Sequence, residues 1–368
     1  QVNAANTWGV RYLQETSPTF DQVSGRWSLA AIREESDVDR TTVGTWNTVL
    51  TNNTFNTVRA AITYEDNVFA TPEFFEGVPQ TERPPTLQML TFRDQQAPDA
   101  NQRINYSYQL DDSFSWFVPE KWGGDHDLKF GFQYIFADAL INNASNMNGT
   151  FVFATDQQFN PADPRTYPER LQIFGPVPDS TYMQSHVLVG FAQDKYQRGN
   201  LTLSLGLRYD LEILPLDTKF NPFIADFQYP VDKNNIAPRL GFAYNPGGEG
   251  RSVIRGGYGL FYDKTHLTII DEFLRTGVYA SSFTASFPTD RIDSGPRAGL
   301  FPTDPYLVNG PTLNRALLDQ RIPPGTLARV TGTAYLDSPD RVVPYSHQVT
   351  AGYQRQIGPQ LGLSADYV

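Results

Sequence analysis

The sequence predicts an all-β fold: a transmembrane antiparallel β-barrel with short periplasmic turns and long extracellular loops. Two observations lead to this prediction. Apolar and polar residues alternate with a period of two in about twelve separate segments, and short and long connections follow one another in strict order along the chain. Alternation gives each strand one apolar and one polar face, which suits a wall between lipid and a polar lumen.

Composition excludes several other classes of protein. The 368 residues include no cysteine and four histidines, so thiol catalysis, disulfide scaffolds and cysteine-ligated metals are ruled out. A balance of 29 basic to 40 acidic residues argues against a nucleic-acid-binding face, because phosphate affinity comes from clustered Lys and Arg. No stretch approaches the ~18 to 20 apolar residues of a membrane helix. A helical membrane protein is therefore excluded as well.

The clearest strand is Leu201 to Leu211, LTLSLGLRYDL, in which Leu and Tyr occupy every odd position. Strict alternation over this length predicts a strand with one apolar face. The same pattern predicts strands at Leu128–Phe136, Leu240–Tyr244, Ile254–Tyr262, Val349–Ile357 and Leu361–Tyr367. Weaker versions, with their apolar residues at alternate positions, occur at Trp8–Tyr12, Trp27–Ala31, Trp46–Leu50, Val58–Tyr64, Ile104–Trp116 and Val187–Phe191.

The connections supply the second signal. Short links rich in Gly, Pro and Asn lie at 52–54, 119–124, 197–200, 246–250 and 358–360. Long loops lie near 66–101, 139–183, 215–235 and 264–344. In sequential hairpins this order puts all the short turns at one rim. A soluble β-sandwich or propeller also alternates, but such folds do not confine long loops to every second connection.

Aromatic residues near the predicted strand ends suit the interfacial girdles of such a barrel. These residues are Tyr64, Tyr134, Phe136, Tyr196, Tyr209, Tyr244 and Tyr262.

Several segments resemble the barrel of TonB-dependent outer-membrane receptors, and among these the Oar-like group. They are GGDHDLKFGFQY (Gly123–Tyr134), ADPRTYPERLQIF (Ala162–Phe174), GFAQDKYQRGNLTLSLGLRYDLEILP (Gly190–Pro215), DKNNIAPRLGFAYNPGGEGRSVIRGGYGLFYDK (Asp232–Lys264) and RVVPYSHQVTAGYQRQI (Arg341–Ile357). The resemblance implies a 22-stranded barrel closed around a plug, with energy relayed by TonB. It also implies the bacterial outer membrane as location, with outer-membrane lipid, the plug and TonB as partners.

The sequence departs from that pattern because no plug-like segment or TonB box is recognisable and about twelve strands are present. We therefore expect residues 1–368 to be a partial barrel domain of a longer receptor, which moves a still unknown substrate across the outer membrane. A passive porin, or a surface assembly or adhesion barrel, is the first alternative. A soluble β-rich binding protein is the second.

No catalytic, cofactor-binding or metal-binding residues are predicted, and we expect no enzymatic activity. The glycine-rich runs 245–252 and 255–261 lack the Lys and the following helix of a phosphate-binding loop. His126 lies between two Asp residues and is expected to be an ordinary polar residue at a strand start. The acidic run 33–39 lacks the spacing of a calcium loop, so it is expected to be solvated loop or rim charge.

Alternation along the strands places a set of charged residues on the polar face. We assign this face to the lumen, because a charge facing lipid costs a few kcal/mol near the bilayer midplane. These candidate lumen-facing residues are Arg59, Glu65, Lys129, Arg208, Asp210, Arg239 and Arg255. The longest loop, 264–344, is the candidate for capturing ligand outside the cell, since long connections are commonly functional. Its repeated Pro and aromatic positions indicate an ordered loop, with Phe283, Phe287, Phe301 and Tyr306 as candidate capture residues.

Overall fold

A computed structural model describes most of the chain. The described residues are 5–22, 25–79, 82–96, 101–143, 146–174, 180–219, 221–275, 278–280, 282–287, 304–321, 327–329 and 337–368. Within these ranges no helix is long and apolar enough to cross a lipid bilayer.

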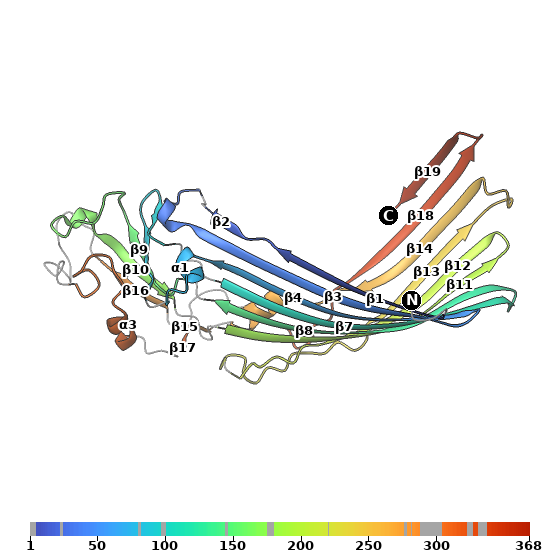
Figure 1. Ribbon diagram of the computed structural model, residues 1–368, viewed down its shortest axis with the longest axis horizontal. Coiled ribbons are helices and arrows are strands. Elements are labelled where there is room, and N and C mark those ends of the chain that lie inside the picture. The colour runs from blue at the N-terminus through green and yellow to red at the C-terminus, as the bar shows by residue number, and fades with distance from the viewer. Residues whose placement is uncertain are drawn as a thin grey trace.

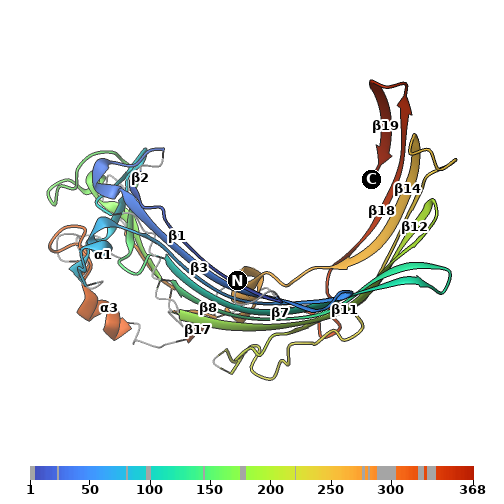
Figure 2. The ribbon, with the colours of Figure 1, turned by 45° about the vertical axis from the view of Figure 1, so that its right-hand side comes forward.

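One large antiparallel sheet forms the body of the protein and curves into a trough (Figures 1 and 2). It contains 12 strands, eleven of them in the order β1-β3-β4-β7-β8-β11-β12-β13-β14-β18-β19, with β2 paired to β3. The strands are β1 (Asn6–Thr16), β2 (Thr19–Gln22), β3 (Arg33–Thr51), β4 (Thr54–Ala70), β7 (Asn101–Lys121), β8 (Gly124–Asn143), β11 (Ser180–Arg198), β12 (Leu201–Ile213), β13 (Ile236–Tyr244), β14 (Ser252–Tyr262), β18 (Tyr345–Ile357) and β19 (Leu361–Tyr367). The predicted sheet of about twelve antiparallel strands is confirmed.

Short hairpins join every second pair of strands, as predicted. The turn between β7 and β8 consists of Trp122 and Gly123, with φ of 50° and 92°. Two positive φ values define the turn whose twist matches that of antiparallel strands. The first two predicted long loops are slightly shorter than predicted, because β4 continues to Ala70, β8 to Asn143, and β11 starts at Ser180, whereas the other two begin one residue earlier, at 214 and 263.

Five strands are much longer than the ~9 to 11 residues that cross a bilayer. β3, β4, β7, β8 and β11 have 19, 17, 21, 20 and 19 residues. A strand of 20 residues spans about 66 Å at ~3.3 Å per residue, well beyond the hydrocarbon layer. These strands therefore extend the sheet out of the membrane on the loop side, toward the smaller strands in Figure 1.

One prediction near the N-terminus is wrong and another is corrected in part. Trp27–Ala31 is not a strand, because Ser28 caps the 3-10 helix η1 (Leu29–Ala31) by accepting a hydrogen bond from the Ala30 amide. The acidic run 33–39, expected to be solvated loop or rim charge, is not a loop but the loop-side end of β3, where Asp37 lies opposite Asn67 and Asp39 opposite Glu65 of β4. Pairing with β4, which has 17 residues, keeps this polar segment extended.

Three of the long loops assemble a second sheet at the extracellular side, which we call the cap sheet. Its order is β16-β10-β9-β5-β6, with strands β5 (Thr86–Gln88), β6 (Arg93–Asp94), β9 (Thr150–Phe153), β10 (Pro168–Phe174) and β16 (Ser282–Ser286). Its core includes Phe151, Leu171 and Tyr167, all buried. The burial of apolar side chains from three separate loops holds those loops together.

The remaining short elements belong to the same loops. They are the helices α1 (Pro72–Phe75), η3 (Pro164–Thr166), α2 (Leu267–Leu274) and α3 (Arg315–Arg321), and the paired strands β15 (Val278–Ala280) and β17 (Leu327–Arg329). Helix α2 packs on the large sheet: its buried Ile270, Phe273 and Leu274 form one apolar cluster with Ala139 of β8 and Met183 of β11.

A phenylalanine covers a glycine in the neighbouring strand at the C-terminal part of the sheet. Phe242 of β13 pairs with Gly256 of β14, and a Cβ atom added to Gly256 would lie 2.6 Å from Phe242 Cε1. On the same face of the sheet, Gly190 has no atom within 4 Å of its added Cβ. The missing side chain of Gly256 thus leaves space for the Phe242 ring, whereas no side chain of the described residues uses the space beside Gly190.

We predict that Gly256→Val destabilises the folded sheet by about 1–3 kcal/mol, the usual cost of overpacking. Gly190→Val, which adds the same side chain without a clash, serves as the control and is expected to have little effect. Thermal unfolding followed by circular dichroism in detergent measures both. Equal losses in the two variants would contradict the steric explanation.

Candidate functional site

Strand pairing sorts the side chains of the large sheet into two faces. Directly paired residues in an antiparallel sheet lie on the same side, so the register can be followed from strand to strand. All seven candidate lumen-facing residues, Arg59, Glu65, Lys129, Arg208, Asp210, Arg239 and Arg255, fall on one face. We call it the charged face, and the opposite one the apolar face.

The apolar face carries large hydrophobic side chains that are exposed to the surroundings. Val10 is 80% exposed, Leu207 54%, Val349 54% and Phe132 44%. A continuous exposed apolar surface of this kind is rare on soluble proteins and marks contact with a partner or a membrane.

Aromatic rings form two bands on the apolar face. On the loop side Tyr64 packs on Tyr106 and Tyr108 on Phe136, with centroids 4.9 and 6.0 Å apart. On the turn side Trp8 stacks on Trp46 at 5.0 Å. From Tyr108 on the loop side to Trp116 on the turn side, β7 advances eight residues, or about 26 Å along the strand at ~3.3 Å per residue. For a strand tilted by ~35–45° this is a height of about 20 Å, close to the ~25 Å apolar band of outer-membrane barrels.

All seven aromatic residues predicted as girdle residues lie on the apolar face: Tyr64, Tyr134, Phe136, Tyr196, Tyr209, Tyr244 and Tyr262.

Strand β11 differs from the simple pattern. Its apolar residues Val187, Val189 and Phe191 lie on the charged face, since Val189 pairs with Gln133 and Asp210. Phe191 lies flat over Gly131, where a Cβ atom would collide with its ring. The alternating apolar residues of β11 therefore pack locally on the charged face and do not belong to the apolar face of the sheet. Only the pairing register shows this distinction.

Three of the seven predicted charges, Arg208, Asp210 and Arg255, are neutralised by close ion pairs. Arg208 binds Asp210, two residues along β12, with Nη2 2.8 Å from Oδ1. Arg255 of β14 binds both carboxylate oxygens of Asp366 on β19, at 2.7 and 2.9 Å. The sequence did not indicate Asp366, because one intervening strand of the sheet, β18, and 111 residues of the chain separate it from its partner.

The other four predicted charges have different surroundings. Glu65 accepts a hydrogen bond of 2.9 Å from Asn105. Arg239 lies over the ring of Phe261, with Cζ 4.5 Å from the centroid. Within the described ranges Arg59 and Lys129 form no hydrogen bond or ion pair.

An acidic group lies on the charged face at the loop side of β3 and β4. Carboxylate oxygens of Asp37, Asp39 and Glu65 lie within 4.8 Å of one another, and each residue is half-buried. Such groups are common on protein surfaces without a metal, so we assign no metal site to them.

His126 is held by protein contacts and is not part of a cluster of metal ligands. Its Nδ1 lies 2.6 Å from Oδ2 of Asp194, and its ring packs between Trp122 and Tyr196, at 5.3 and 4.9 Å. The pair lies on the apolar face near the hairpin turns.

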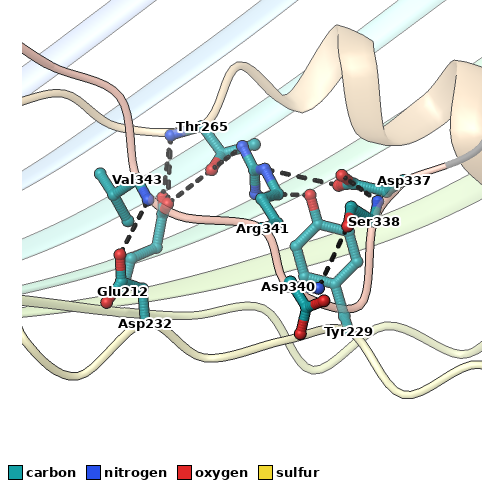
Figure 3. Close-up of polar contacts among 9 residues, drawn as sticks. All are labelled: Glu212, Tyr229, Asp232, Thr265, Asp337, Ser338, Asp340, Arg341 and Val343. Carbon is teal, nitrogen blue, oxygen red and sulfur yellow. Dashed lines mark hydrogen bonds and ion pairs between the residues drawn. The ribbon is translucent and has the colours of Figure 1, made fainter.

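A polar network fixes both ends of the longest loop (Figure 3). Arg341 donates to Tyr229 Oη at 2.6 Å and to Thr265 Oγ1 at 3.0 Å, and its Nε lies 3.4 Å from Asp337 Oδ2. Thr265 Oγ1 in turn donates to Glu212 Oε2, at 2.7 Å, at the end of β12. The network therefore ties loop 263–344 to loop 214–235 and to the sheet.

Electrostatics support this arrangement around Tyr229. Burial raises the pKa of the Tyr229 phenol, and its hydrogen bond with Asp337 acts in the same direction. The phenol therefore stays protonated at ordinary pH, so that it can donate to a carboxylate while it accepts from Arg341.

Three of the four candidate capture residues belong to the apolar core of the cap sheet or pack against it. Phe287 and Tyr306 are 5% and 4% exposed in its core, and Phe283 packs against that core. Phe301 lies outside the described residues. Burial assigns Phe287 and Tyr306 a role in packing the loop fold, and a direct contact of these two rings with ligand does not fit their positions.

A curved antiparallel wall with one exposed apolar face between two aromatic bands is the architecture of a transmembrane β-barrel. The chain belongs to a family described as "Outer membrane beta barrel domain", whose model matches residues 1–368. Its location is the bacterial outer membrane. No curated protein matches the sequence.

Solved structures of outer-membrane proteins are similar to this chain at low sequence identity, and the first of them, with a TM-score above 0.5, shows the same fold. The outer membrane transporter YddB from Escherichia coli is 15% identical, with a TM-score of 0.61 over 97% of this chain and 37% of that one. The ferric-catecholate import receptor Fiu from E. coli is 10% identical, with a TM-score of 0.47 over 98% of this chain and 48% of that one. The siderophore receptor PiuA from Acinetobacter baumannii is 12% identical, with a TM-score of 0.44 over 98% and 46%. The chain thus spans less than half the length of these structures.

We predict that Phe132→Arg prevents assembly in the membrane, because a charged side chain on the lipid face near the midplane costs about 2–4 kcal/mol. Gln133→Arg, one position away on the charged face, is the matched control and is expected to be mild. The amount of protein in the outer-membrane fraction measures both. Similar yields for the two variants would contradict the assignment of the faces.

We predict that Arg341→Met loosens loop 263–344, because hydrogen bonds to charged groups are worth about 1.5–3 kcal/mol each. The expected result is faster chymotrypsin cleavage within the loop. The control, Arg251→Met, changes an exposed turn residue paired only with Glu249 at 3.5 Å. If cleavage rates were the same in both variants, the network would not hold the loop.

Proposed function

We propose that this chain supplies the barrel wall and extracellular loops of a TonB-dependent transporter that moves a substrate across the outer membrane. The supporting observation is the pairing of an exposed apolar face with a charged face across the whole sheet. In a closed barrel the charged face lines the lumen, where charges remain hydrated or paired. The resemblance of segments such as Gly190–Pro215 to TonB-dependent receptors supports the energised mode over passive flow.

The arrangement of the loops supports a receptor role at the cell surface. The cap sheet combines residues from the loops after β4, β8 and β14, so these three loops are one folded unit. A folded unit of this size at the barrel mouth offers a preorganised surface for ligand, which lowers the entropic cost of binding. Because Phe287 and Tyr306 are buried, ligand contacts would come from exposed residues of the cap and from the charged face.

We predict that the complete protein carries a plug domain and a TonB box upstream of these residues, and that it binds the purified periplasmic domain of TonB. In planar lipid bilayers it should give no steady conductance, because the plug blocks the passage through the barrel. Pull-down and conductance measurements test the two expectations. A passive porin predicts stepwise conductance and no TonB binding, and this outcome would overturn the proposal.

A further inference from the structure

A hollow of about 310 Å³ lies on the charged face where β11, β12 and β13 run side by side. The register arranges its residues in two rows across the strands, Gln193–Gly206–Arg239 and Lys195–Ser204–Gly241. All six belong to the charged face, and they line the hollow together with Asp194, Leu205 and Leu240, which belong to the apolar face by register. Only Arg239 among them was indicated by the sequence.

Glycines make the hollow. A Cβ atom added to Gly206 would lie 3.6 Å from Cβ of Arg239 and 3.7 Å from Cβ of Gln193. A Cβ added to Gly241 would lie 3.5 Å from Cβ of Ser204. Side chains at these two positions would therefore fit but would fill the floor, whereas glycine leaves it open between four polar side chains.

The hollow has more positive than negative charge around it on the charged face. Within the described part of the chain the side chains of Lys195 and Arg239 form no hydrogen bond or ion pair, although Arg239 also lies over the Phe261 ring, whereas Arg208 and Arg255 each bind an Asp. Lys129 continues the first row beyond Gln193 and adds a third cation. The nearest acidic residue on this face is Asp127, which lies opposite Lys195 in the register but forms no ion pair with it. The carboxylate of Asp194 is bound to His126 on the apolar face.

We infer that this hollow binds an anionic group, a carboxylate or a phosphate, of a small solute in the lumen. The guanidinium of Arg239 and the ammonium of Lys195 supply charge, and Ser204 and Gln193 supply neutral donors, the groups that recognise such anions. Its volume equals that of about ten water molecules, which suits a small solute and not a protein segment. The inference rests on the proposed function, since it identifies an anionic substrate for the same lumen.

Titration calorimetry of the complete protein in detergent at low salt, with inorganic phosphate and succinate as probes, tests the inference. We expect binding of at least one probe, weakened at least tenfold by Lys195→Gln or Arg239→Gln and strengthened by Asp127→Asn. The difference between the probes separates phosphate from carboxylate recognition. Gly206→Val should weaken binding to a similar extent, since it fills the hollow without changing charge.

Arg11→Gln is the matched control: it removes the same charge from the charged face on β1, at the far edge of the sheet. It should leave affinity unchanged. If Arg11→Gln weakened binding as much as Arg239→Gln, or if neither probe bound the wild type, the inference would be overturned. TonB binding and bilayer conductance do not depend on the hollow, so the proposed function would survive that failure.

Discussion

The structure depends on one constraint, that backbone amides and carbonyls in lipid must find their partners within the protein. Between the outer edges of β1 and β19, the large sheet meets it with continuous antiparallel pairing from strand to strand. The pairing of β8 with β11 alone runs without interruption from Asn142 to Asp125. Such a ladder fixes the register, because a slip by one residue would turn every apolar side chain to the polar side. The two faces follow directly from this.

The register also decides which charges meet. Arg255 reaches Asp366 across β18, over a glycine that leaves room for both side chains, whereas Arg208 finds Asp210 on its own strand. Lys195 and Arg239 have no such partner, and they lie around the glycine-floored hollow. The chain is acidic overall, with a net charge of −11, yet it keeps this part of the charged face positive. Uneven distribution of charge is the physical basis on which such a lumen selects solutes.

Outside the membrane, the extended ends of the long strands and the loops form a second folded part of the structure. β3, β4, β7, β8 and β11 continue beyond the apolar band, and three loops close over their side of the sheet as the cap sheet (Figure 1). The apolar core of the cap sheet and the polar network around Arg341 hold the loops in different ways, one by burial and one by directional hydrogen bonds. Together they make the longest loop part of a folded unit with defined attachment points.

The sequence by itself determined the fold class, the alternation of short turns and long loops, and the common face of Arg59, Lys129 and Arg239. These features are local, since they depend on parity and on turn residues within one strand or hairpin. Only the tertiary structure decided what depends on contacts between distant segments. It placed Phe287 and Tyr306 in a core, turned the apolar residues of β11 to the charged face, and brought Lys195, Ser204 and Arg239 around one hollow. The reason is that pairing register and loop packing join residues far apart in the chain, which periodicity along a single strand cannot reveal.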